Sequence, residues 1–153
     1  MKRYILILFY TCVVFKAAAQ TVRNDSMEYS SVKLEKDDKV FLALKDTAQK
    51  HLQVFINDLN KHGKDGKNYR FGIKSDFVQN GKHEHMWSRI YEYKNGVFKG
   101  VFIDSAFTVK NIKMGDKVAI NRTAIEDWAI DNLINGETLG NFSDKYLESK
   151  KKK

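Results

Sequence analysis

Residues 69–104, YRFGIKSDFVQNGKHEHMWSRIYEYKNGVFKGVFID, alternate apolar and polar side chains and contain the pairs Asn80-Gly81 and Asn95-Gly96. Alternation with a period of two is typical of β-strands that bury one face. Asn-Gly favours a two-residue hairpin turn, because both central residues of that turn need a positive φ. The stretch therefore predicts a meander of three antiparallel strands. Their expected bounds are residues 69–77, 83–93 and 97–104.

The pattern downstream of the meander is less regular. Short strands are expected at residues 117–120 and 128–130, and Leu139 to Phe142 can pair back onto the second of these. A further short strand at residues 107–112 is an alternative to a loop. A single helical turn is expected from Ala124 to Asp127, with Thr123 as its cap. Residues 145–153 are expected to trail off without regular structure.

Upstream of the meander, residues 38–62 have the spacing of an amphipathic helix. Apolar side chains recur every three or four residues, at Phe41, Leu44, Ala48, Leu52, Phe55 and Leu59. Asp37 or Asp38 can cap the start of the helix, and Gly63 can end it. The sequence therefore predicts an α+β fold. Its N-terminal helix packs on a curved antiparallel sheet or on a partial SH3-like barrel.

Residues 1–19 have the composition of a secretory signal peptide. Lys2 and Arg3 precede an apolar run that is too short to span a bilayer, and Ala17-Ala18-Ala19 offers small residues for cleavage. The only cysteine, Cys12, lies in this run, so the mature chain is expected to have no disulfide. The predicted divisions are a signal peptide at 1–19, a flexible leader at 20–36, one α+β domain at 37–143 and a basic lysine-rich tail at 144–153.

The net charge of +8 is concentrated at the two ends of the chain. Of the 27 basic residues, three lie in the predicted signal and four in the run Lys150, Lys151, Lys152 and Lys153, which leaves 20 basic against 19 acidic residues. A nearly neutral body argues against nucleic-acid binding. The lysine run is either a solvated end or a weak contact with an anionic surface.

The densest group of reactive side chains is His83-Glu84-His85-Met86-Trp87. On a strand, the two histidines face one side with Trp87, while Glu84 and Met86 face the other. Two histidines spaced in this way can bind one zinc ion if a further ligand completes the site. The carboxylates considered as that ligand are those of Glu92, Asp104, Asp127 and Asp131.

A second group, Ile125-Glu126-Asp127-Trp128, allows two interpretations. In the structural one, the tryptophan fills the core and the acid accepts hydrogen bonds from backbone amides. In the functional one, Trp87 and Trp128 line one groove. The candidate binding residues of that groove are Glu84, His85, Trp87, Tyr91, Asp127 and Trp128.

Several short motifs occur in an order that resembles the YegJ-like family, domain of unknown function 2314, across residues 40–142. The motifs are Arg70-Phe71-Gly72-Ile73-Lys74, Glu84-His85-Met86-Trp87, Phe98-Lys99-Gly100, Val109-Lys110-Asn111, Gly115-Asp116-Lys117-Val118 and Ile125-Glu126-Asp127-Trp128. The resemblance implies a bacterial source and this fold, and it assigns no catalytic residue. Members of the family often have a Gly-Gly pair where this chain has Leu139-Gly140-Asn141.

The sequence contains none of the standard nucleophile, phosphate-loop or zinc-protease motifs. We therefore expect a non-enzymatic binding or interaction module, exported to the periplasm or the cell exterior, with no catalytic residue, no cofactor and no transmembrane segment in the mature chain. Its partner would be an envelope protein or a small ligand. The alternative is a metal-dependent or acid–base hydrolase that uses His83, His85 and a carboxylate, with zinc as the metal.

Overall fold

The computed structural model describes residues 39–151, with the side chain of Lys151 excepted. The predicted signal peptide and leader lie outside the described residues. Along the chain the elements are α1 (Lys39–His62), β1 (Tyr69–Gln79), β2 (Lys82–Lys94), β3 (Val97–Phe102), β4 (Lys117–Asn121), a 3₁₀ turn (Arg122–Ala124), β5 (Ile125–Asn132), β6 (Glu137–Gly140) and α2 (Phe142–Lys151).

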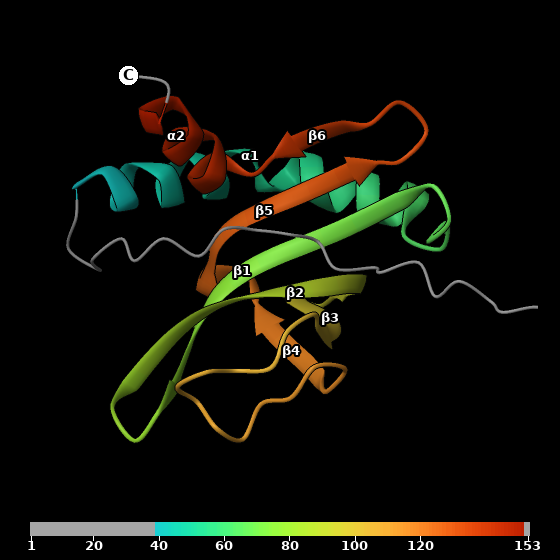
Figure 1. Cartoon of the computed structure of the whole chain (residues 1–153). Helices are drawn as coiled ribbons and strands as arrows, with labels where there is room; N and C mark the ends of the chain where they lie inside the picture. Colours follow the sequence, from blue (N-terminus) through green and yellow to red (C-terminus); the bar gives the residue numbers. More distant parts are fainter. Residues whose placement is uncertain (1–38, 152–153) are drawn as a thin grey trace, which may run out of the picture.

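The strands form one antiparallel sheet in the order β4-β3-β2-β1-β5-β6. The sheet is twisted and open, with α1 packed across one face and α2 beside β5 (Figure 1). The predicted α+β fold with a helix on a curved antiparallel sheet is confirmed, and the sheet does not close into a barrel. β1 lies between β2, which is the next strand in the chain, and β5, which is distant from it in the sequence.

The predicted meander is confirmed, and the two Asn-Gly pairs make its turns. Asn80 and Gly81 have φ values of 51° and 74°, and Asn95 and Gly96 have φ values of 52° and 78°. Positive φ at both central positions is the geometry of the favoured two-residue hairpin turn. These turns fix the register of β2 against its two neighbours.

Register divides the side chains between two faces of the sheet. On the face we call the core face, Ser88, Ile73 and Trp128 lie side by side across β2, β1 and β5. On the opposite face, which we call the polar face, Trp87, Lys74 and Asp127 lie side by side in the same strands. Neighbouring residues along a strand alternate between these faces.

α1 covers the core face through the apolar stripe seen in the sequence. The ring of Phe55 contacts the rings of Phe71, Phe98 and Trp128, with centroids 5.7 to 5.8 Å apart. The indole N–H of Trp128 donates to the backbone oxygen of Ala48, at 2.8 Å. This helix and three strands therefore share one buried cluster.

Three expectations for the second half of the chain are wrong. Residues 107–112 form a loop and not a strand. The helical turn precedes its expected place, since Arg122–Ala124 is 3₁₀ and residues 125–127 already belong to β5. Residues 145–151 continue α2 rather than trailing off. The pairing of residues 139–140 with β5 is confirmed.

The position where members of the YegJ-like family often have Gly-Gly lies in a tight turn of this chain. Gly140 has a φ of 75° and Asn141 a φ of 53°. Asparagine tolerates this left-handed region better than most residues do. Asn141 also donates its backbone N–H to the backbone oxygen of Trp128, at 2.7 Å. The asparagine therefore preserves the turn that the second glycine would make.

Candidate functional site

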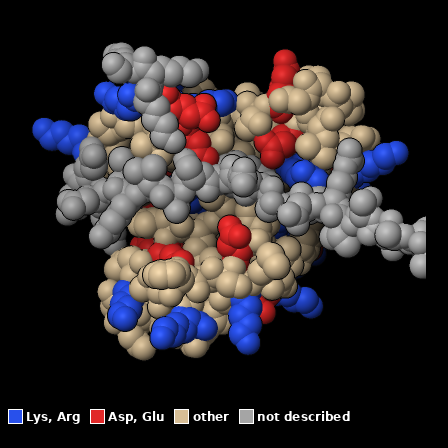
Figure 2. All heavy atoms as spheres, in the orientation of Figure 1, with Lys and Arg blue, Asp and Glu red and all other residues tan. Residues whose placement is uncertain are grey.

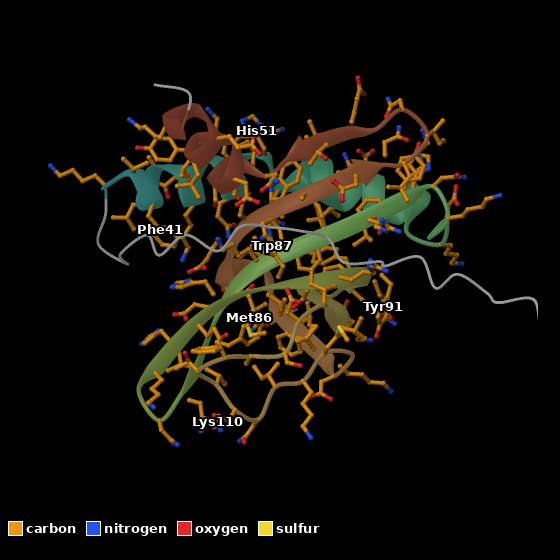
Figure 3. The ribbon with its side chains drawn as sticks, in the orientation of Figure 1. Phe41, His51, Met86, Trp87, Tyr91 and Lys110 are labelled. Carbon is orange, nitrogen blue, oxygen red and sulfur yellow. The ribbon has the colours of Figure 1, made fainter. Side chains whose placement is uncertain are left out.

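Three of the six predicted binding residues meet at one cavity, which we call the β2-edge cavity. Its volume is about 240 Å³. One wall is a continuous run of β2, and the other comes from the loop after β3 (Figure 3 labels Met86 and Trp87). The lining residues are Glu84, His85, Met86, Trp87, Asp104, Ser105 and Phe107.

The wall formed by β2 is a strand side without a strand partner among residues 39–151. β1 pairs with β2 from Lys82 to Arg89, on one side of the strand. β3 pairs with the other side only from Ser88 onward, because β3 ends at Phe102. On that second side, residues 84–86 therefore border the cavity and the loop rather than another strand.

Glu84 holds the loop that forms the opposite wall. Its carboxylate accepts the backbone N–H groups of Phe107, Thr108 and Val109, at 2.7, 2.6 and 2.9 Å. Partial burial acts to raise the pKa of Glu84, but the three N–H donors outweigh it and lower the pKa below its ordinary value. The carboxylate is thus a structural anchor, and its oxygens are already engaged.

His85 is paired with a buried carboxylate on β5. Its Nδ1 lies 2.6 Å from Oε2 of Glu126, and the side chains are 27% and 5% exposed. The hydrogen bond that His85 donates to the Glu126 carboxylate raises the pKa of His85, against the effect of burial. The edge of its ring also contacts Phe41 at the start of α1, with centroids 5.8 Å apart. A buried acid that orients a partly exposed imidazole is an arrangement suited to binding or to proton transfer.

The partners of the two histidines differ from those expected. His83 contacts Asp76 on β1, at 2.7 Å, and His85 contacts Glu126 on β5, so neither acid is one of the four carboxylates considered as ligands. The two histidines share a face with Trp87, as predicted. Each pairs with a different acid, and residues 39–151 contain no group of three or more His, Cys, Asp or Glu side chains placed to hold a metal ion.

The groove expected between the two tryptophans is not formed. Trp128 is 1% exposed and lies on the core face, whereas Trp87 is 7% exposed and lies on the polar face. The prediction that both line one groove is wrong, because the register of β1 places them on opposite sides of the sheet. Trp128 has the structural role that was the alternative interpretation.

Asp127 also has that structural role. It is 0% exposed, and its Oδ2 accepts the backbone N–H and the hydroxyl of Ser143, at 2.8 and 2.7 Å. Its Oδ1 accepts the N–H groups of Trp128 and Phe142. This carboxylate caps the start of α2. Burial raises the pKa of the neighbouring Asp144, although Lys74 acts in the opposite direction.

Tyr91, the last predicted binding residue, does not line the cavity. It is 48% exposed, at the bulge where the pairing of β2 with β3 shifts by one residue. A bulge directs a side chain away from the regular alternation of its strand. Tyr91 lies apart from Trp87 along the same strand (Figure 3).

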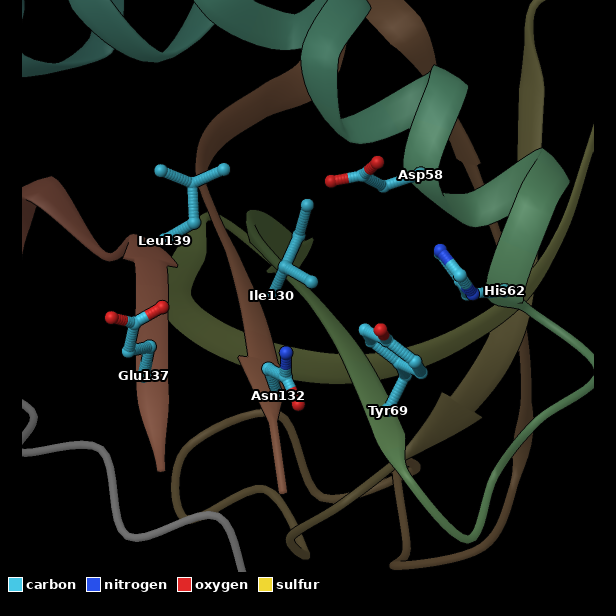
Figure 4. Close-up of a pocket in the computed structure, with 7 residues that line it drawn as sticks. All are labelled: Asp58, His62, Tyr69, Ile130, Asn132, Glu137 and Leu139. Carbon is cyan, nitrogen blue, oxygen red and sulfur yellow. The ribbon is translucent and has the colours of Figure 1, made fainter. Parts of the chain in front are cut away.

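Sequence reasoning missed a second cavity at the opposite end of the sheet, with a volume of about 270 Å³. The rings of His62 and Tyr69 stack at its wall, 4.2 Å apart (Figure 4). Asp58 and His62 are four residues apart in the helix, a spacing that places them on one side and could have indicated a site. The remaining lining residues are Ile130, Asn132, Glu137 and Leu139.

Comparison with known proteins gives one match. The model of DUF2314, a family described as an uncharacterized protein conserved in bacteria, matches residues 21–152. This match confirms the domain of unknown function that the motif order predicted. No curated protein and no solved structure matches the chain. Neither α-helix within residues 39–151 combines the length and the apolar character that crossing a bilayer requires.

Proposed function

This chain belongs to the DUF2314 family of bacterial proteins, and we propose that it is an exported, non-enzymatic binding module of the cell envelope. In this proposal the β2-edge cavity takes an extended segment of another envelope protein. The observation that carries the proposal is the side of β2 at residues 84–86, which has no strand partner among residues 39–151 and borders the cavity. Extended peptides add to strand sides of this kind.

The side chains around the cavity suit recognition of such a segment. The imidazole of His85, oriented by Glu126, offers a polar contact next to the strand. Trp87 and Phe107 offer apolar surface on the two sides of the cavity. The carboxylate of Glu84 keeps the loop in place through three amides, which preserves the shape of the cavity before a ligand arrives.

Export is supported by the composition of residues 1–19 and is tested separately. Protein purified from its native host should begin at Gln20, as read by N-terminal sequencing. A chain that still begins at Met1 after fractionation with the cytoplasm would contradict the location, while leaving the binding proposal open to its own test.

The binding proposal is tested with a library of extended peptides displayed on phage and selected on the purified mature chain. Asp104→Trp fills the cavity from an exposed position, and His85→Ala removes the polar contact; both should weaken the selected peptides by about tenfold or more. Asn60→Trp, at an exposed position of α1, is the matched control and should bind as the natural chain does. Peptides that bind all four proteins equally would refute the site.

A second candidate function is favoured by the His85–Glu126 pair. A buried carboxylate at 2.6 Å from an imidazole is the arrangement of an acid–base pair, and the hydroxyl of Ser105 lines the same cavity. The hydrolase alternative predicts turnover of ester or amide substrates that disappears in both His85→Asn and Glu126→Gln. Absence of turnover across a substrate panel would remove it.

The zinc version of that alternative is tested by elemental analysis. His83 and His85 share the polar face, but their Nδ1 atoms contact different carboxylates. If zinc bridges the two rings, protein purified with added zinc should contain about one equivalent, and His85→Ala should lose it. A metal-free protein after that treatment would set zinc aside.

A further inference from the structure

Three strongly exposed apolar side chains lie at one end of the molecule. This end, which we call the loop edge, consists of the β1–β2 turn with residues 78–82 and the loop of residues 103–116. Phe107 is 93% exposed, Met114 68% and Val78 57%. Exposed apolar side chains are ordinary on a protein surface, so the charges that surround these three decide what they can contact.

The exposure of these side chains is built into the loop. The backbone N–H of Phe107 donates to Glu84, and that of Met114 donates to the hydroxyl of Ser105, at 2.7 and 3.1 Å. The loop buries Val109, which is 4% exposed, between them. Hydrogen bonds and one buried residue hold this loop in place. The phenylalanine ring nevertheless remains in solvent, where it is available to a binding partner.

Basic side chains surround the apolar ones. Lys82, Lys110, Lys113 and Lys117 are exposed here, against the exposed carboxylates of Asp104 and Asp116. Part of the acidic charge is engaged, because Asp116 accepts the backbone N–H of Lys113, at 2.8 Å. Figure 2 shows Lys and Arg side chains projecting along this lower edge of the molecule, and Figure 3 places Lys110 on it.

We propose that the loop edge docks on the surface of an anionic lipid bilayer. Phe107 and Met114 enter the boundary between headgroups and acyl chains, and the lysines contact the anionic headgroups. Apolar residues that project from a loop among lysines fit a lipid interface, which is soft and has no fixed shape to match. The docking surface adjoins the β2-edge cavity, which Phe107 also lines, and it requires no ligand there.

Vesicle sedimentation tests the proposal with the mature chain. Vesicles of equal phosphatidylglycerol and phosphatidylcholine should bind the protein, and binding should fall as salt is raised or when phosphatidylcholine is used alone. Two double variants should each lower the partition coefficient by about tenfold or more. They are Phe107→Ser with Met114→Ser, and Lys110→Glu with Lys113→Glu.

Matched controls come from the opposite end of the sheet. Leu133 and Ile134 are 40% and 69% exposed, and Leu133→Ser with Ile134→Ser should bind as the natural chain does. The charge control is Lys64→Glu with Lys67→Glu, at exposed positions of the α1–β1 turn. His85→Ala should also keep vesicle binding, which separates this surface from the β2-edge cavity.

Insertion has its own readout. In Phe107→Trp the emission should shift to shorter wavelength on anionic vesicles and be quenched by brominated lipid. The proposal is overturned if the chain ignores anionic vesicles, or if the controls lose binding as strongly as the loop-edge variants. It is also overturned if only deletion of Lys150 to Lys153 abolishes binding, or if the loop-edge variants lose a protein partner and no lipid.

Discussion

The core face and the polar face of the sheet use their aromatic side chains differently, although the two faces alternate residue by residue along each strand. On the core face, Trp128 is enclosed by α1 and its indole N–H is satisfied by the helix backbone. On the polar face, Trp87 lines a cavity beside His85. Side chains alternate between the two faces along a strand. The position of an aromatic residue in this alternation therefore decides whether its ring packs in the core or lies next to the candidate site.

The largest expected effect breaks the core face. Trp128→Ala removes a side chain that is 1% exposed and contacts Phe55 and Phe142. We expect a loss of about 3–5 kcal/mol in the free energy of unfolding, measured by urea denaturation. Tyr91→Ala, at a 48% exposed position, is the control and should change it by about 0.5 kcal/mol or less. A loss for Trp128→Ala as small as that of the control would contradict the assigned core.

The next effect concerns the backbone that closes over the same tryptophan. A Cβ at position 140 would overlap the backbone oxygen and the ring of Trp128, and Gly140 has a φ of 75°. We expect Gly140→Ala to lower the free energy of unfolding by about 2–4 kcal/mol. Gly136 has a φ of 74° and open space around it, so Gly136→Ala isolates the conformational part, about 1 kcal/mol. Equal losses would show that packing on Trp128 contributes nothing.

Local signals in the sequence were sufficient for much of the fold. The spacing of apolar residues gave α1, and the Asn-Gly pairs gave the β1–β2–β3 meander. α2 was not predictable in this way, because it is only 10 residues long and its start is capped by Asp127 from β5. A helix that depends on a cap so distant in the sequence carries no sufficient signal of its own.

The candidate site was predictable within one strand and not between strands. Alternation correctly placed His83, His85 and Trp87 on one face. The acids that pair with the histidines come from β1 and β5, and the pairing of those strands includes a shift at Lys74/Ser75 that no local pattern reveals. For the same reason the sequence could not tell that Trp87 and Trp128 lie on opposite faces.

A smaller effect tests the polar face where it is structural. Asp127 uses both oxygens to accept N–H and O–H donors at the start of α2, and Asp127→Asn replaces one acceptor with a donor. We expect a loss of about 1–3 kcal/mol in the free energy of unfolding, with reduced helical circular dichroism. Asp46→Asn, on an exposed side of α1, should have little effect. An unchanged helix content in Asp127→Asn would mean that α2 needs no cap.

The smallest effect distinguishes the polar face by its response to pH. The hydrogen bond that His85 donates to Glu126 raises the pKa of His85; burial and Lys74 oppose this shift, and Asp76 supports it. Because the pKa is higher in the folded chain, the stabilising contribution is complete below the unfolded pKa of about 6.5 and is lost as pH rises through the folded value. We therefore expect stability to fall by about 1 kcal/mol between mildly acidic and mildly alkaline pH, and His85→Gln to remove that part of the slope.

His83→Gln is the matched control, since its partner Asp76 lies at a similar distance of 2.7 Å but its own side chain is 40% exposed. Solvent screens such a pair, so its removal should change the slope less. If His83→Gln flattens the pH dependence as much as His85→Gln does, the buried acid at the β2-edge cavity is not what distinguishes the two histidines.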